Sequence, residues 1–367
     1  MIAAKPIYVY VGTYTERLWF VDGKGRGIYV FTLDPASGAL NPVSLAGDVV
    51  SPALLAVAPN RRFLFSVNEC ERADGKPGGA VSAFAIDPSS GTPSFLNRQP
   101  SHGLFPCFVS VDRTSSLVVV GNHESGSIAC YPVEPDGRLG EASDVIQHAG
   151  SSVHPQHQRG PHVHSVNFDP TDRYLLVCDK GTDRVVVYRV DLANGKLLPN
   201  DPPHASFEPG SGPRHLAFHP SGRHAFVINE LNATLTALRL DITSGTLRVL
   251  QTLPTLPGGY AGPNYTADVH VHPNGRFVYG SNRGHDSLAI FEFDASSEQL
   301  TALGHEPTRG AVPRAFGIDP SGKLLLAANQ NSDTIVAFRI EETSGALTPT
   351  GAVTRTPTPV CVRFVQG

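Results

Sequence analysis

Short runs in which apolar and polar residues roughly alternate recur along the whole chain, and tight turns separate them. The clearest unit is 212–230, where His219-Pro220-Ser221-Gly222 divides one run from the next. Alternation at every second position indicates half-buried strands. Proline in second place and glycine in fourth place suit a type I turn. The unit therefore predicts two antiparallel strands joined by a tight turn.

The same turn recurs at a nearly constant spacing. Counting two degenerate copies, its second position falls at residues 59, 113, 170, 220, 273 and 320, which are 54, 57, 50, 53 and 47 residues apart. A third strand such as 27–33 and a turn such as 34–40 into a fourth strand complete the unit. Four strands in about fifty residues are typical of a propeller blade. Because 367 residues divided by seven give about 52 for each blade, we predict an all-β, seven-bladed β-propeller that spans residues 1–367 as a single domain.

The two ends of the chain complement each other. Residues 8–13 resemble the second strand of a unit, but no first strand precedes them, whereas residues 358–366 match the first-strand pattern of 51–57. We therefore expect 358–366 to complete the N-terminal blade and close the ring, which removes open sheet edges. Loops longer than a blade requires are expected at 16–26, 69–79 and 147–161.

Composition and charge exclude several classes of function. The net charge of −4 provides no basic surface for nucleic acid, and no apolar run of 18 residues could cross a membrane. Residues 1–6 lack the apolar core of a secretory signal. The five cysteines are odd in number and form no Cys-x-x-Cys pair, so we interpret them as reduced thiols. These features predict a cytoplasmic protein without a nucleic-acid or membrane partner.

Aligning the units on their turns places two sets of residues at one end of every blade, because the first and second strands are antiparallel. The start of the first strand holds Ala53, Cys107, His164, Arg214, Ala267, Arg314 and Val360, and the end of the second holds Thr13, Glu69, His123, Lys180, Glu230, Arg283 and Gln330. First strands line the channel of a propeller, so both sets are expected around its mouth. The asparagines just before the second set (68, 122, 229, 282 and 329) are expected to cap local backbone.

Charged residues concentrate in four successive blades of this ring. They are His164, Arg214, Glu230, Asp268, Arg283 and Arg314. Arginine holds carboxylate or phosphate in a two-pronged grip, and histidine or glutamate can move a proton near neutral pH. The set therefore predicts a site for an anionic small molecule. A purely structural ring of ion pairs is the alternative interpretation.

Five histidines lie within 148–164, at positions 148, 154, 157, 162 and 164. His162 and His164 fall on one face of a strand, since strand residues alternate. No acidic residue or cysteine lies among them, and the preceding segment is interpreted as a loop, so we predict no metal. His164 is expected to point into the site while the others decorate the loop.

Six stretches of the chain carry a likeness to a known family, at 10–15, 161–164, 212–215, 227–230, 281–284 and 312–316. The chain resembles the seven-bladed lactonase propellers, which include propeller-type 6-phosphogluconolactonase and fungal 3-carboxy-cis,cis-muconate cyclase. The acting residues proposed for that family are a histidine, an arginine, a glutamate and a second arginine. The resemblance implies that they are His164, Arg214, Glu230 and Arg283, which the alignment of units also selects.

The first hypothesis for function is hydrolysis of a sugar-acid lactone, with 6-phosphogluconolactone as the leading candidate, without metal or cofactor. Glu230 or His164 would take a proton from the attacking water, and Arg214 with Arg283 would stabilise the oxyanion. The expected substrate contacts are Arg314, Asp268, His162, Glu69 and Asn329. A Gly-x-Ser-x-Gly elbow is absent, which argues against an acyl-enzyme.

Two other hypotheses remain open. The same residues could close a carboxymuconate-type diacid to a lactone, with two arginines on the carboxylates and His164 or Glu230 delivering a proton. The propeller could also be a non-catalytic scaffold, because this fold supports many functions. Scaffolds usually present aromatic hot spots, and the predicted face offers few beyond Tyr14, Tyr260 and Tyr265.

Overall fold

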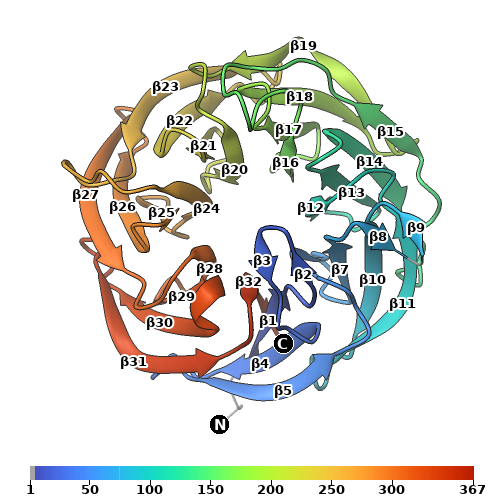
Figure 1. Ribbon diagram of the computed structural model, residues 1–367, viewed down its shortest axis with the longest axis horizontal. Coiled ribbons are helices and arrows are strands. Elements are labelled where there is room, and N and C mark those ends of the chain that lie inside the picture. Colours follow the sequence, from blue (N-terminus) through green and yellow to red (C-terminus); the bar gives the residue numbers. More distant parts are fainter. Residues whose placement is uncertain (1–4, 74) are drawn as a thin grey trace.

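Seven four-stranded antiparallel sheets are arranged radially around one axis (Figure 1). This computed structural model describes residues 5–73 and 75–367. The sheets confirm the prediction of an all-β, seven-bladed propeller. No helical segment in these two ranges has the length and hydropathy needed to cross a bilayer.

Each blade runs from an inner to an outer strand. Blade 1 contains β32 (Pro359–Gln366), β1 (Ile7–Thr13), β4 (Ile28–Leu33) and β5 (Leu40–Ala46), and blade 2 contains β6 (Leu55–Val57), β7 (Phe63–Asn68), β10 (Ala80–Ile86) and β11 (Pro93–Pro100). Blade 3 contains β12 (Pro106–Val111), β13 (Leu117–Asn122), β14 (Ser127–Pro132) and β15 (Asp144–Gln147), and blade 4 contains β16 (Val163–Phe168), β17 (Tyr174–Asp179), β18 (Arg184–Asp191) and β19 (Lys196–Ser206).

The remaining blades repeat this order. Blade 5 contains β20 (Pro213–Phe218), β21 (His224–Asn229), β22 (Thr234–Leu240) and β23 (Leu247–Pro254), and blade 6 contains β24 (Tyr265–Val271), β25 (Phe277–Arg283), β26 (Ser287–Asp294) and β27 (Gln299–Pro307). Blade 7 contains β28 (Pro313–Ile318), β29 (Leu324–Asn329), β30 (Thr334–Ile340) and β31 (Leu347–Arg355). Two short hairpins, β2–β3 (Arg17–Leu18, Val21–Asp22) and β8–β9 (Arg72–Ala73, Lys76–Pro77), and the 3₁₀ turn η1 (Gln330–Ser332) lie outside the blades.

The second strand of a blade is buried on both faces. Every residue of β7, β13, β17, β21 and β29 is buried, because each blade packs between two neighbours. Phe226 and Ile228 of blade 5, for example, share one apolar cluster with Val269 and Val278 of blade 6. The expectation of half-buried strands was therefore wrong for these elements, and their near-continuous apolar runs reflect contact with two adjacent blades.

The C-terminal strand closes the ring as predicted. β32 pairs antiparallel with β1, from Ile7 opposite Gln366 to Thr13 opposite Pro359, and the two lie side by side in Figure 1. Val362 of β32 joins Val9 and Val11 of β1 in an apolar cluster that continues to Leu326 of blade 7. Closure therefore joins the first and last blades through apolar packing as well as backbone pairing.

The repeated turn also closes as predicted. The amide of Gly222 donates to the carbonyl of His219 at 2.8 Å, and that of Gly322 donates to Asp319 at 2.9 Å. Both glycines have positive φ, 69° and 75°, a conformation that costs glycine little because it lacks a Cβ. These turns hold the first and second strands of each blade in register.

Six of the seven inner strands carry a bulge at the same place, near their first residue. In β20, for example, Pro213 pairs with Asn229 and His215 with Ile228, which leaves Arg214 unpaired. The residues left out of register in this way are Cys107, His164, Arg214, Ala267 with Asp268, Arg314 and Val360. A bulge redirects the side chain of its extra residue. The same irregularity thus repeats at the positions that the alignment of units selected.

Val362→Ala should lower stability by about 2–3 kcal/mol, since it removes two methyl groups from a packed cluster and leaves a cavity. Val362 is 1% exposed, whereas Val353 on outer strand β31 is 57% exposed. Val353→Ala is therefore the matched control, and its free energy of unfolding should stay close to that of the wild type. Thermal or denaturant unfolding measures the stability of both variants. Equal stability would contradict the conclusion that apolar packing of β32 helps to close the ring.

Candidate active site at the channel mouth

A cavity of about 630 Å³ opens at one end of the propeller axis. Its walls include residues from the ends of inner and second strands of several blades, among them Glu69, His164, Glu230 and Arg283. The predicted long loops contribute as well. Trp19 and Phe20 come from 16–26, Glu69 from the start of 69–79, and Gln156 with His157 from 147–161. Two of the long loops therefore reach this mouth, and the third reaches it with its first residue alone.

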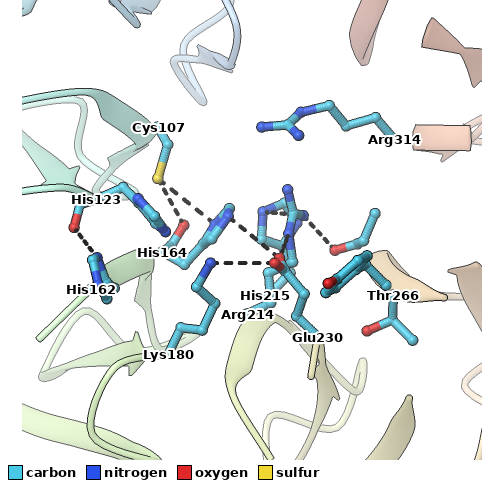
Figure 2. Close-up of polar contacts among 12 residues, drawn as sticks. Cys107, His123, His162, His164, Lys180, Arg214, His215, Glu230, Thr266 and Arg314 are labelled. Carbon is cyan, nitrogen blue, oxygen red and sulfur yellow. Dashed lines mark hydrogen bonds and ion pairs between the residues drawn. The ribbon is translucent and has the colours of Figure 1, made fainter. Parts of the chain in front are cut away.

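Glu230 lies at the centre of an ion-pair network (Figure 2). Its Oε2 atom is 2.8 Å from Nε of Arg214, and its Oε1 atom is 3.2 Å from Nζ of Lys180. Oε2 also lies 3.2 Å from Nη2 of Arg283. Nε2 of His164 lies 3.9 Å from Oε2. Arg214, Lys180 and Glu230 come from blades 4 and 5, and Arg283 comes from blade 6. One carboxylate therefore joins three neighbouring blades.

The charges around Glu230 decide its protonation. Burial alone would raise its pKa, but Lys180, Arg283 and Arg214 outweigh that effect and hold the pKa of Glu230 well below its usual range. Burial lowers the pKa of Arg283 to about 9, although Glu230 opposes the shift. Glu230 is thus ionised at neutral pH and neutralises part of the positive charge.

His164 is buried between Cys107 and Glu230. Nδ1 of His164 lies 3.7 Å from Sγ of Cys107, and its ring contacts the rings of His123 and His215 edge to face, each at 5.2 Å between centroids. Burial and the adjacent Arg214 hold the pKa of His164 well below its usual value. The imidazole is therefore neutral at neutral pH and has a lone pair available to accept a proton.

A second carboxylate faces the cavity from blade 2. Oε2 of Glu69 accepts a hydrogen bond from the hydroxyl of Tyr14 at 2.6 Å, and Nη2 of Arg314 donates to that hydroxyl at 2.8 Å. The guanidinium of Arg314 also lies over the Tyr14 ring, 5.3 Å from its centroid. Burial raises the pKa of Glu69, and Arg314 and Tyr14 offset only part of that effect. The cavity thus holds two carboxylates in different electrostatic settings.

Arg214 lies behind Glu230, outside the cavity wall. It is 2% exposed, and its Nη1 atom contacts Nε2 of His215 at 3.0 Å and donates to the carbonyl of Ala267. His215 in turn bonds Asp268, 2.9 Å from Nδ1 to Oδ1. The buried chain Asp268–His215–Arg214 fixes the guanidinium that contacts Glu230.

Six of the nine residues selected from the sequence line the cavity. They are His164, Glu230, Arg283, Arg314, His162 and Glu69. The cavity wall does not include Arg214, Asp268 or Asn329. Asn329 instead donates from its amide to the carbonyl of Thr308 at 3.1 Å. Asn68, Asn122 and Asn282 bond backbone carbonyls of preceding segments in the same way. These four asparagines bond backbone as predicted, but the carbonyls lie 18–27 residues away in the sequence instead of nearby. The prediction was wrong for Asn229, whose amide donates to the side-chain hydroxyls of Thr234 and Thr236.

Lys180 and Tyr14 belong to the site, although the sequence analysis placed them near the mouth without assigning either a catalytic or a substrate-binding role. Lys180 occupies the same repeat position as Glu230 and Arg283, so its place in the ring was a usable signal. Tyr14 follows β1 directly and is fully buried against Glu69. The sequence pattern does not predict the contact between Tyr14 and Arg314, because the two residues lie 300 positions apart in the chain.

The histidines of 148–164 do not gather into one cluster. His148 bonds Asp179 away from the cavity, 2.8 Å from Nδ1 to Oδ2. Within the described residues, His123, Glu124 and His162 form one group whose possible metal-binding atoms all lie within 4.8 Å of one another. Nδ1 of His123 is already 2.9 Å from Oε1 of Glu124. The absence of a metal stays a prediction.

Comparison with known proteins gives a consistent result over the whole chain. Residues 8–364 match the family model described as "Lactonase, 7-bladed beta-propeller". A 6-phosphogluconolactonase of Bacillus subtilis is 37% identical over 357 residues, which cover 97% of this chain and 98% of the relative. A 6-phosphogluconolactonase of Formosa agariphila is 33% identical over 85% of this chain and 86% of its own. The solved structure of a periplasmic gluconolactonase of Pseudomonas aeruginosa has a TM-score of 0.90 and 35% identity, covering 98% of this chain and 99% of its own.

Glu230→Gln should destabilise the protein by about 3–5 kcal/mol at neutral pH, because three buried or half-buried cations lose their counter-charge. Since the folded-state pKa of Glu230 lies well below 4.5, the carboxylate stabilises the fold fully above about pH 4.5 and progressively less below it. The stability difference from wild type should therefore be constant between about pH 4.5 and neutral pH, below the titration of Arg283, and it should shrink in stronger acid. Denaturant unfolding as a function of pH measures it.

Glu298→Gln is the matched control for that experiment. Its carboxylate also contacts three basic side chains, His224, Arg239 and Arg248. The two arginines are largely exposed, so water screens them and the loss should be much smaller. Equal losses for the two variants would show that burial does not strengthen the Glu230 network.

Proposed function

The chain belongs to the lactonase family of seven-bladed β-propellers, and we propose that it hydrolyses the lactone of a sugar acid, with 6-phosphogluconolactone as the favoured substrate. Relatives that align over nearly their full length carry the names 6-phosphogluconolactonase and gluconolactonase. One structural observation supports the proposal most directly. A neutral imidazole, that of His164, lies 3.9 Å from a carboxylate bound to three cations at the wall of one cavity.

We assign the general base to His164. Both His164 and Glu230 were candidates, but three cations stabilise the Glu230 carboxylate and make it a weak base. The neutral imidazole of His164 can take a proton from a water that attacks the lactone carbonyl. Glu230 then stabilises the imidazolium that forms, since its Oε2 atom faces Nε2 of His164.

Arg283 and Lys180 are the cations best placed to stabilise negative charge on the substrate. Both line the cavity, and the tetrahedral intermediate carries an oxyanion that such donors stabilise in a site shielded from water. Arg314 of blade 7 also lines the cavity and adds a third cation that can bind an anionic group. Arg214 is buried behind Glu230, so we assign it a positioning role instead of direct contact with substrate.

The alternatives have less support. Cyclisation of a carboxymuconate would use the same residues, but the relatives named above carry lactonase names. A structural ring of ion pairs does not require the neutral, buried histidine or the cavity beside it. A protein-binding scaffold usually presents a cluster of exposed aromatic side chains. Trp19 and Tyr265 at this cavity are exposed, but Phe105 is buried and charged side chains form much of the wall.

We also propose a cytoplasmic location. All five cysteines are unpaired and buried, as expected of a protein kept under reducing conditions.

Wild-type protein should accelerate hydrolysis of 6-phosphogluconolactone above the spontaneous rate at neutral pH. A chelator should not abolish this activity, because the proposed steps use side chains alone. Unphosphorylated gluconolactone is the comparison substrate, and faster loss of the phosphorylated lactone alone would locate its phosphate on the basic wall. No acceleration of either lactone would contradict the proposed function and favour cyclisation or a scaffold.

His164→Asn should lower kcat by roughly 10²–10⁴, the usual contribution of a general base. Because the pKa of His164 lies well below 6.5, wild-type kcat/KM should stay constant as pH falls through 6.5 and drop only in stronger acid. His204→Asn on outer strand β19 is the control and should keep the wild-type rate. An unchanged rate for His164→Asn would refute the assignment of the base.

A further inference from the structure

Glu69 and Glu230 occupy the same position in two different blades. Each directly follows a second strand, β7 or β21, and donates its backbone amide to a carbonyl of the preceding loop, that of Ser51 at 3.0 Å or Gly212 at 2.7 Å. Both side chains line the same cavity. Since their backbone placement is equivalent, any difference in chemistry must come from their neighbours.

The neighbours of the two carboxylates differ in charge. Glu230 contacts three cationic side chains. Among the described residues, the side chain of Glu69 accepts one hydrogen bond, from the neutral hydroxyl of Tyr14. Arg314 donates to that hydroxyl and not to the carboxylate. Two carboxyl groups whose surroundings push their pKa values apart are typical of an acid paired with a group that stays ionised.

The Tyr14 hydroxyl also leaves one oxygen of Glu69 available. Tyr14 contacts Oε2, while Oε1 has no hydrogen-bond partner in the described part of the chain. The tyrosine is itself fixed, by Arg314 over its ring and by the edge of Phe20, whose ring centroid is 5.5 Å away. Phe20 belongs to the segment that joins β2 to β3, so this inserted hairpin supports the group that orients Glu69.

We propose that Glu69 is the general acid of the lactonase, which protonates the ring oxygen as the lactone opens; this inference rests on the proposed function. Water adds to the carbonyl carbon while His164 takes its proton. The bond between that carbon and the ring oxygen then breaks, and the ring oxygen receives the proton of Glu69 and leaves as a hydroxyl group. Solvent finally returns the proton from His164 to Glu69.

A general acid is needed at this step because the leaving group is an alcohol, and an alkoxide leaves poorly. Glu230 is unsuited to the task, since its cations keep it ionised. The raised pKa of Glu69 favours its protonated form, and the hydrogen bond to Tyr14 holds the carboxyl group in place. The two glutamates therefore have different roles. Glu230 stays ionised and binds the cationic side chains, and Glu69 supplies the proton.

Glu69→Gln tests this role with little change of shape. On the lactone that the wild type hydrolyses faster, its kcat should fall by roughly 10²–10⁴ with little change in KM, because proton donation acts in the transition state. The fall of wild-type kcat with rising pH that reports loss of the Glu69 proton should disappear in this variant, whereas a fall near pH 9, where Arg283 titrates, should remain. Glu69→Asp should keep that fall and recover part of the rate. The control is Glu342→Gln, at an exposed loop position.

Three results would overturn the inference while leaving the proposed function intact. They are kcat and KM both unchanged in Glu69→Gln, a lower kcat that still falls with rising pH below about 9 as in the wild type, and an unchanged kcat with a raised KM. The last would return Glu69 to the substrate-binding role predicted from the sequence. Wild-type protein that hydrolyses neither 6-phosphogluconolactone nor gluconolactone would instead overturn the proposed function itself.

Discussion

The buried carboxylate of Glu230 is the constraint on which the site depends. Lys180, Arg214 and Arg283 are brought close together from three blades, and like charges at such distances repel strongly where little water reaches them. The ionised carboxylate of Glu230 offsets this repulsion, because it attracts all three cations. It also fixes the chemistry of the pocket, because a carboxylate so well stabilised holds cations and leaves proton transfer to other groups.

The propeller frame explains how such a cluster forms from distant parts of the chain. Six of the seven blades present a bulge residue at the start of the inner strand, and every blade presents a residue at the end of its second strand. The ring brings these equivalent positions to one mouth. His164 and Arg214 are bulge residues in successive blades, while Lys180 and Glu230 follow the second strands of the same two. One repeated backbone irregularity therefore supplies several different functional groups.

The inserted segments then break the symmetry of the ring. Segment 16–26 places Phe20 against the ring of Tyr14, and segment 147–161 adds Gln156 and His157 to the cavity wall. A closed ring without these insertions would offer a shallower, more uniform mouth. The surroundings of Glu69 in blade 2 therefore differ from those of Glu230 in blade 5. The first glutamate bonds a tyrosine and the second contacts three cations.

The sequence by itself determined the fold, the number of blades, the closure by residues 358–366 and most of the ring of polar residues. It could do so because each blade repeats a local pattern of strands and turns, and that pattern fixes which positions are equivalent. Only the tertiary structure decided what each of those positions does. Arg214 lies behind Glu230, Asp268 accepts a hydrogen bond from His215, and Asn329 bonds a backbone carbonyl. Tyr14 contributes to the site because it bonds Arg314, which is 300 residues away in the sequence. Burial and the sum of charges from several blades set these roles, and neither quantity can be read from one repeat.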